Sequence, residues 1–298
     1  MKFKKCEVCG SNAWVLVYKG KIRDGIFGKY VENAEVKKCN NCKVQRLIEN
    51  KCIGLSSYIN SSYRQKLSKG IDVESFYNEQ DIQQIFTLKT LWPTSIRDKN
   101  IMDVGAGGGS LLDNMSVQSK NQIAIEPFQN YHSSLSNRGY NVFSSLKDSL
   151  GDWKDSIDVA FAIQVIEHTS NPRLFLEEIR PLLKKNGILI LSTPNADDIL
   201  LDLLPEEYPS FFYRVVHRWY FNIQSLIFCA ETAGFKVEQV KPVHRYSMSN
   251  AMNWLKYKKP MGDSRLKSVD KSIDDTWRSY LENNNKSDCM YLILSKNK

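Results

Sequence analysis

One stretch of the 298-residue chain decides its fold: Ile101-Met102-Asp103-Val104-Gly105-Ala106-Gly107-Gly108-Gly109. An apolar run ends in an acid and a glycine-rich segment, as at a strand that turns sharply into a helix. Glycine permits such a turn, and its missing Cβ lets a ligand approach the backbone. The following helix begins at about Ser110, so its N-terminus would face the ligand. The stretch therefore predicts a nucleotide site at the end of a buried strand.

Alternating strands and helices are expected around this stretch. Asn171 can cap one helix, Pro172 fits its first turn, and Gly187 is expected to stop it. Strands are predicted at 101–104, 122–125, 140–143, 157–163, 188–191, 235–240 and 289–294. This order predicts an α/β fold with a Rossmann-like, doubly wound, mostly parallel sheet. The last strand is expected to insert antiparallel beside the sixth.

The second predicted strand ends in Glu126, 23 positions after Asp103. In doubly wound sheets an acid at this place hydrogen-bonds the ribose hydroxyls of a nucleotide. The glycine pattern, however, is Asp-x-Gly-x-Gly-x-Gly and not the Gly-x-Gly-x-x-Gly of dinucleotide sites. The residues therefore point to a nucleotide other than a dinucleotide.

This pattern resembles motif I of the class I S-adenosylmethionine-dependent methyltransferases. Three later segments resemble that superfamily's further motifs, in the same order: Ala124–Pro127, Gln164–Pro172 and Leu191–Asn195. The resemblance covers about residues 75–298. It implies a glycine loop for the methionine part of S-adenosylmethionine, Glu126 for the ribose and Gln164 beside the sulfonium. The implied cofactor residues are Asp103, Gly105, Ala106, Gly107, Gly109, Glu126, Pro127, Ser145 and Gln164.

Two C-x-x-C pairs, Cys6/Cys9 and Cys39/Cys42, are separated by 29 residues near the N-terminus. This spacing can place four thiolates around one zinc ion, and strand-like runs lie between the pairs. A redox dithiol or disulfides are alternatives that the paired spacing disfavours. The sequence thus predicts a small zinc ribbon whose closed site serves folding and not catalysis.

The predicted domains are a zinc ribbon at 1–57 and a methyltransferase domain at 58–298, with substrate-binding insertions at 196–222 and 241–287. Residues 1–100 contain 18 Lys or Arg and 10 Asp or Glu, whereas residues 101–298 contain 23 of each. This excess would attract nucleic acid, a nucleotide-sugar or a polysaccharide on a phospholipid carrier. Ordinary solvated lysines account for it equally well.

The sequence has no apolar run of roughly 20 residues, the length needed to span a bilayer. The first residues, Met1–Cys6, contain no hydrophobic signal core. A cytoplasmic location is therefore expected, where thiolates stay reduced and can bind metal. The oligomeric state is not predicted.

An aromatic segment, 197–222, follows the fifth strand and is expected to form a lid over the ligand crevice. Within it, His217-Arg218-Trp219-Tyr220-Phe221-Asn222 resembles a segment of bacterial sugar methyltransferases, among them zinc-bearing C-methyltransferases. Those enzymes have Tyr-Glu-His where this chain has Val215-Val216-His217. Since only the histidine matches, the resemblance implies a sugar acceptor but disfavours C-methylation.

Methyl transfer to a hydroxyl needs a base, and histidine suits this task near neutral pH. His217 in the lid is the favoured base, and His168, after the fourth strand, is the second candidate. A structural hydrogen bond is the commoner use of such a histidine as His168. His132 is expected on a surface helix and is not a candidate.

The segment 244–255 resembles a stretch in uncharacterised methyltransferases of surface-polysaccharide gene clusters. Its polar groups suit sugar hydroxyls, so the expected acceptor-binding residues are Tyr220, His244, Arg245 and Asn250. An equally acceptable interpretation places Trp254 and Leu255 in a helix core and Arg245 in solvent.

Three functions are compatible with these patterns. The first is O-methylation of a sugar, nucleotide-sugar or polysaccharide hydroxyl with a histidine base. The second is RNA base methylation, with the basic ribbon binding phosphates. The third is a binding module without catalysis, which the intact glycines and Glu126 disfavour.

Overall fold

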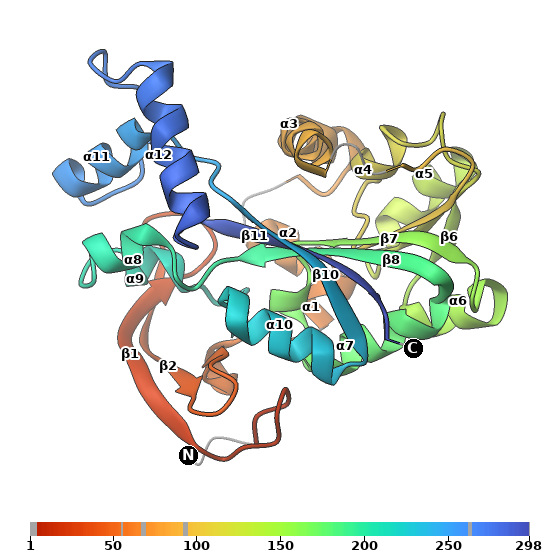
Figure 1. Cartoon of the computed structure of the whole chain (residues 1–298), viewed down its shortest axis with the longest axis horizontal. Helices are drawn as coiled ribbons and strands as arrows, with labels where there is room; N and C mark the ends of the chain where they lie inside the picture. The colour runs from red at the N-terminus through yellow and green to blue at the C-terminus, as the bar shows by residue number, and fades with distance from the viewer. Residues whose placement is uncertain (1–4, 55, 67–69, 92–94, 262–263, 298) are drawn as a thin grey trace. The chain divides into compact units, whose positions relative to one another are not determined.

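The computed structural model describes residues 5–54, 56–66, 70–91, 95–261 and 264–297 (Figure 1). The absence of a hydrophobic signal core was predicted from Met1–Cys6. Of these residues, Met1–Lys4 lie outside the described residues. The chain forms two compact units, each built from several segments. The first unit comprises Met1–Cys52, Ser192–Cys229 and Gln239–Leu292, and the second comprises Ile53–Leu191, Ala230–Glu238 and Ile293–Lys298.

The second unit contains most of a seven-stranded sheet of order β10-β11-β8-β7-β4-β5-β6, and strands β8, β10 and β11 each continue into the first unit. The sheet is mostly parallel, with one antiparallel strand, and β11 lies beside β10 as predicted for the terminal strand. The α/β, Rossmann-like fold class is thus confirmed. The strands are β4 Asn100–Val104, β5 Asn121–Ile125, β6 Asn141–Phe143, β7 Ile157–Ile163, β8 Leu183–Pro194, β10 Phe235–Val243 and β11 Cys289–Lys296.

The register of the sheet brings the ends of several strands to one edge. Asp103 on β4 pairs with Ala124 on β5 and with Phe161 on β7, and Ile125 pairs with Phe143 on β6. Because these pairs are parallel, the residues that follow all four strands meet at the same edge. The glycine-rich loop therefore lies next to the residues that follow β5 and β7.

Helices cover both faces of this sheet (Figure 1). The view shows α3, α4 and α5 over one face and α6 and α7 under the other. The helices of the second unit are α1 Ser56–Ile59, α2 Ser62–Lys66, α3 Val73–Leu91, α4 Ser110–Asp113, α5 His132–Asn137, α6 Leu146–Trp153 and α7 Pro172–Ile179. Short 3-10 turns complete them: η2 Gln129–Tyr131, η3 Ile166–His168 and η4 Arg180–Leu182.

Helix α7 begins as predicted but ends earlier. The Asn171 side chain accepts a hydrogen bond from the backbone N–H of Leu174 at 3.0 Å, and Pro172 lies in the first turn. The helix stops at Ile179, before the 3-10 turn that contains Pro181, and Gly187 lies inside β8. The prediction that Gly187 stops this helix was wrong. Its real constraint is packing, since a Cβ there would lie 2.5 Å from the carbonyl oxygen of Ile157.

The first unit contains a four-stranded sheet of order β1-β2-β3-β9. Its strands are β1 Trp14–Arg23, β2 Tyr30–Cys39, β3 Gln45–Leu47 and β9 Trp219–Tyr220. The antiparallel β1–β2 hairpin matches the two strand-like runs predicted between the cysteine pairs. Strand β9 comes from the aromatic segment 197–222 and pairs antiparallel with β3. The predicted lid thus completes the sheet that begins at the cysteine pairs.

Helices α8 Ile199–Leu203, α9 Pro209–Phe212, α11 Met248–Tyr257 and α12 Lys271–Asn283, with η1 Glu49–Lys51, belong to the first unit, and α10 Ile223–Thr232 spans both. In the first unit, aromatic side chains of the two predicted insertions, 196–222 and 241–287, pack against each other. The Trp254 ring lies 5.0 Å from Tyr208 and 4.9 Å from Phe211, measured between centroids. Trp254 is therefore a core residue, as the alternative interpretation proposed. Leu255, which that interpretation also placed in the core, is 43 % exposed, so this part of it was wrong. None of the helices in the described ranges is long and apolar enough to cross a membrane.

Candidate functional site

The glycine loop after β4 is held against the end of β5 by backbone hydrogen bonds. Gly105 and Ala106 donate their N–H groups to the Ile125 carbonyl at 2.8 and 3.2 Å. Gly107 has a left-handed backbone with φ of +56°, and a Cβ there would lie 2.3 Å from the ring of Phe76. Both constraints require glycine at this position. Phe76 belongs to α3, so this helix packs directly on the loop.

Glu126 ties the loop to the second strand. One carboxylate oxygen accepts the N–H of Gly107 at 2.7 Å, and the other accepts the N–H of Phe128 at 2.7 Å. Burial raises the pKa of Glu126 to about 7, although these two bonds act in the opposite direction. Each carboxylate oxygen keeps a second lone pair, so Glu126 can still accept hydrogen bonds from two ribose hydroxyls.

Asp103 is the second buried acid at this edge. Its side chain is 4 % exposed. Burial raises the pKa of Asp103 to about 7, and the nearby Glu126 charge adds to the shift. Buried carboxyl groups with strongly raised pKa values are common at functional sites.

Three residues that the sequence did not identify, Arg64, Phe76 and Tyr131, lie close to the glycine loop or to Glu126. Arg64 of α2 lies over the rings of Phe76 and Tyr131, 5.2 and 5.9 Å from their centroids, and pairs with Glu79. The Tyr131 hydroxyl is buried and has no hydrogen-bond partner among the described residues. No motif marks α2 or α3, so only the fold could place these side chains beside the loop.

These features fit S-adenosylmethionine. The unpartnered Tyr131 hydroxyl and the acceptor capacity of Glu126 and Asp103 suit the hydroxyl groups and positive charge of this cofactor. The structure brings Asp103, the loop 105–109 and Glu126 to one edge of the sheet. That these residues bind the cofactor stays a prediction from the resemblance.

Two further predicted cofactor residues lie at the ends of neighbouring strands. Gln164 follows β7 in a left-handed conformation with φ of +57°, which costs free energy outside glycine and is common at functional sites. Ser145 follows β6 and caps α6, because its hydroxyl accepts the Asp148 N–H at 3.3 Å. Pro127 directly follows Glu126 and is half-buried.

Three of the histidines considered as bases from the sequence have different surroundings. His168 ends η3 in the second unit, and its Nδ1 lies 3.1 Å from the hydroxyl of Tyr58. His217 is buried in the first unit, with its ring 6.0 Å from that of Tyr220. His132, expected at the surface, is half-buried and its Nε2 lies 2.6 Å from the Glu126 carbonyl oxygen.

The predicted acceptor residues of 244–255 take part in a buried polar network of the first unit. Asp288 pairs with the Arg245 guanidinium at 2.6 Å and lies 3.4 Å from His244 Nδ1. Burial lowers the pKa of His244, and the Asp288 charge opposes this shift. Asn250 lies in the first turn of α11, where its N–H is capped by Ser247. Arg245 is thus ion-paired and mostly buried.

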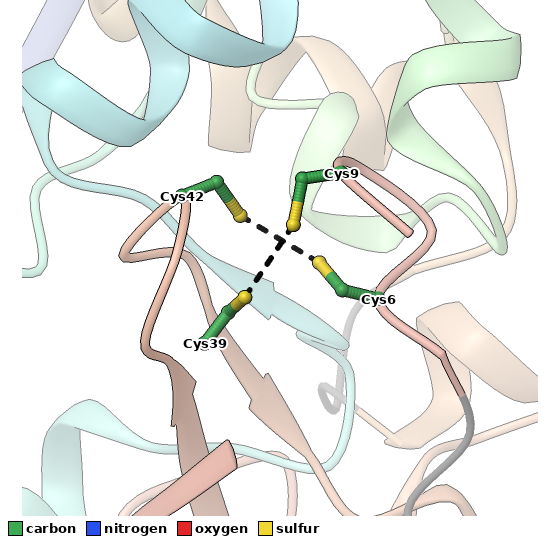
Figure 2. A group of neighbouring side chains, drawn as sticks. All are labelled: Cys6, Cys9, Cys39 and Cys42. Atoms are coloured by element: carbon green, nitrogen blue, oxygen red, sulfur yellow. Dashed lines mark hydrogen bonds between the residues drawn. The ribbon is translucent and has the colours of Figure 1, made fainter. Parts of the chain in front are cut away.

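Figure 2 shows the four cysteines of the N-terminal pairs pointing toward one another. The Cys6 and Cys42 sulfurs are 3.6 Å apart, and those of Cys9 and Cys39 are 3.5 Å apart. All four sulfur atoms lie within 4.8 Å of one another. A zinc ion with Zn–S bonds of about 2.3 Å needs sulfurs about 3.8 Å apart, so the cluster is compatible with a tetrahedral zinc site.

Each cysteine pair lies on a tight backbone turn of the same design. Gly10 donates its N–H to the Cys6 carbonyl at 2.7 Å, and Lys43 donates to the Cys39 carbonyl at 3.0 Å. Both donors are left-handed, with φ of +75° and +64°. The turns aim both sulfurs of each pair at one point, which is the arrangement that a shared metal requires.

The glycine loop, the buried acids and the seven-stranded sheet define a class I S-adenosylmethionine-dependent methyltransferase. The family described as "Methyltransferase domain" matches residues 77–240, which is more than half of the chain. The chain belongs to this family and contains a class I S-adenosylmethionine-dependent methyltransferase domain.

Curated relatives carry a more specific name. The chain is 32 % identical over 121 residues to "Ubiquinone biosynthesis O-methyltransferase" of Rickettsia bellii, covering 38 % of this chain and 50 % of that protein. It is 26 % identical over 133 residues to the protein of that name in Azorhizobium caulinodans, covering 42 % and 53 %. The chain spans about half the length of these relatives. Neither name refers to a carbohydrate.

Among solved structures, a SAM-dependent methyltransferase from Archaeoglobus fulgidus has the same fold. It superimposes with a TM-score of 0.52 at 15 % sequence identity, covering 75 % of this chain and 97 % of that one. At this identity the similarity concerns the fold alone.

Proposed function

We propose that this methyltransferase methylates a hydroxyl group of a carbohydrate, and that His217 is the base. The observation that carries the proposal is the position of His217. This histidine is buried in the unit that also contains the polar network around Asp288 and the aromatic side chains of 197–222. The names of the curated relatives support transfer to oxygen.

S-adenosylmethionine, when bound, supplies an electrophilic methyl group on a sulfonium. The task left to the protein is to hold the acceptor hydroxyl and take its proton. An imidazole can do this near neutral pH. His168 is the weaker candidate because a structural hydrogen bond is the commoner use of a histidine at this place, and the Tyr58 hydroxyl lies 3.1 Å from its Nδ1. We assign His168 to positioning and His217 to proton transfer.

A carbohydrate is favoured over a quinone by the chemistry of the first unit. Charged side chains such as Arg245 and Asp288 form its buried network, and these suit hydroxyl groups better than an isoprenoid tail. The resemblance of 217–222 and 244–255 to sugar and surface-polysaccharide methyltransferases points the same way. The relatives' ubiquinone names apply to proteins that share about half of their length with this chain.

We further propose that Cys6, Cys9, Cys39 and Cys42 hold one structural zinc ion. Four protein sulfurs leave no open coordination position, so the metal would support folding. Since β9 pairs with β3, a metal that orders the ribbon would also order the segment that contains His217. A reducing compartment, which we expect to be the cytoplasm, would keep the thiolates available.

RNA methylation is less well supported. Part of the positive charge of the N-terminal region is neutralised within the first unit, since Lys19 and Lys37 pair with Glu35. Arg46 pairs with Glu7 and is 3 % exposed, so it cannot contact a phosphate backbone.

The test compares His217→Gln with His168→Gln in the zinc-loaded enzyme. We expect His217→Gln to lower kcat by 10²-fold or more, the order of magnitude of general-base catalysis, with S-adenosylhomocysteine affinity unchanged. His168→Gln should change kcat less. A fully active His217→Gln variant would show that another group takes the proton.

A further inference from the structure

Two arginines of the first unit lie side by side. Arg23 ends β1 and Arg214 follows α9, and they are partners in a parallel backbone bridge. Arg23 donates its N–H to the Tyr213 carbonyl at 3.0 Å, and its own carbonyl accepts the N–H of Val215 at 3.1 Å. Because partners across a bridge point to the same side, the two guanidinium groups are neighbours.

Neither guanidinium group is neutralised. The Nε atoms of Arg23 and Arg214 are buried without a hydrogen-bond partner, and no carboxylate among the described residues lies within 4.0 Å of either side chain. Four other arginines of this unit do pair with acids: Arg46, Arg218, Arg245 and Arg278. The absence of an acid beside two adjacent cations is therefore particular to this place.

Burying two adjacent positive charges costs free energy unless a negative charge or another favourable contact offsets it. Burial, together with the neighbouring charge of Arg214, lowers the pKa of Arg23 to about 10. The Phe211 ring lies 4.0 Å from the Arg23 guanidinium and gives partial compensation. Buried donors without partners require a physical cause, and a bound anion supplies one.

The pair is also held in place and reachable. The Tyr220 hydroxyl accepts the Arg214 N–H at 2.8 Å and donates to the Arg214 carbonyl at 3.0 Å, which fixes this backbone. Both arginines are half-buried, so a ligand can reach part of each side chain from solvent although the Nε atoms are covered. A rigid pair of forked donors loses little entropy when it binds an anion.

We propose that Arg23 and Arg214 bind a phosphoryl group of the acceptor, which makes the substrate a sugar phosphate or a sugar joined to a diphosphate. A phosphate ester offers up to two negative charges and several acceptor oxygens, matching two guanidinium forks, whereas a carboxylate offers one charge. The inference rests on the proposed function only in taking the phosphoryl group to be part of the acceptor.

The first test uses inorganic phosphate and pyrophosphate as probes and needs no methyl transfer. Calorimetry on the zinc-loaded full chain at pH 7.5 should show binding by the wild type. Arg23→Gln and Arg214→Gln should each weaken that binding roughly 10-fold or more, since each loses a charge-assisted fork. Arg265→Gln is the matched control, because Arg265 is an exposed arginine of the same unit.

Folding is monitored independently. Removing one of two unpaired, adjacent cations should leave the Tm of Arg23→Gln equal to or above that of the wild type. A large drop in Tm would show that the pair is structural and would overturn the proposal. Equal pyrophosphate affinity in Arg23→Gln, Arg214→Gln and Arg265→Gln would also overturn it.

The two sources of the phosphoryl group are separated by competition. Tighter binding of pyrophosphate than of phosphate indicates a diphosphate-linked sugar, and the reverse order indicates a sugar monophosphate. Loss of turnover after phosphatase treatment of the acceptor pool, with S-adenosylhomocysteine binding intact, ties the site to the reaction. If the enzyme methylates no carbohydrate yet the arginine pair binds pyrophosphate, the proposed function fails while the anion site stands.

Discussion

At the scale of single residues, the two buried acids Asp103 and Glu126 carry the most information. Both have pKa values raised to about 7, mainly by burial. A cofactor with a positive charge and ribose hydroxyls needs them ionised. The affinity for the cofactor should therefore depend on pH in a range where isolated carboxyl groups do not titrate.

We predict that S-adenosylhomocysteine binds more tightly as the pH rises from 5.5 to about 7 and changes little above pH 8. Glu126→Gln should weaken binding by about 10-fold or more, because a buried hydrogen-bond acceptor for the ribose is lost. Calorimetry across this pH range measures both effects. A flat pH profile in the wild type would contradict the assigned protonation.

The same acids set the stability of the cofactor-free protein. Their pKa values are higher in the folded than in the unfolded chain, so the folded state holds more protons between pH 4 and 7. The free energy of unfolding should therefore fall as the pH rises through this range. Denaturant titrations should show a smaller fall for Asp103→Asn, since its amide does not ionise. An equal slope in wild type and variant would count against a raised pKa of Asp103.

The sequence indicated the glycine loop and these two acids for a physical reason. Glycines at the end of a strand, and acids at fixed distances from them, are local features that spacing alone can indicate. Arg23, Arg214 and Tyr131 escaped because each is an ordinary residue in its own segment. Arg23 and Arg214 become neighbours only because a bridge joins positions 191 residues apart.

At the scale of elements, β8 shows where sequence patterns mislead. Gly187 suggested a helix end, but the helix ends at Ile179 and the glycine serves the close approach of β8 to Ile157. Strand β9 consists of only Trp219–Tyr220, which is too short to show the alternating hydrophobic pattern of a strand. Strand β7 was predicted at its observed bounds, since a mostly apolar run of this length is typical of a buried strand. Strand β8 extends beyond the predicted 188–191 at both ends, to Leu183–Pro194.

The glycines of β8 and α6 give a matched prediction. Gly187→Ala should lower the free energy of unfolding by about 1–3 kcal/mol, because its Cβ would collide with the backbone of β7. Gly151→Ala should raise it by about 0.5–1 kcal/mol, since Gly151 lies in α6 with open space around its Cβ position. Denaturant titration of both variants compares them directly. Equal effects of the two substitutions would show that packing at Gly187 is not the constraint.

At the scale of the whole molecule, the cysteine cluster is expected to affect more than its own hairpin. β2 carries Cys39 and pairs with β3, which pairs with β9. The sheet thus connects the predicted metal site with the segment that contains His217. The sequence predicted the ribbon and the aromatic segment as separate parts, because nothing in either pattern indicates that they share a sheet.

We predict one zinc ion per chain in native mass spectrometry. Chelation should speed amide hydrogen exchange in β1, β2 and β3 and in β9, because the metal orders the whole sheet. Cys39→Ser should lose the zinc ion, whereas Cys52→Ser, outside the cluster, should keep it. If chelation changes hydrogen exchange only near Cys6–Cys42 and leaves β9 unchanged, the metal does not order the segment that contains His217.

The central claim is methyl transfer to a hydroxyl of a phosphorylated carbohydrate. The most direct measurement incubates the zinc-loaded enzyme and S-adenosylmethionine with a nucleotide-sugar and sugar-phosphate pool, and in parallel with total RNA. Mass spectrometry follows S-adenosylhomocysteine and the methylated product. We predict S-adenosylhomocysteine and an O-methylated sugar in the carbohydrate reaction, both lost after phosphatase treatment. Turnover with RNA alone would contradict this account and would assign the basic N-terminal region to nucleic acid.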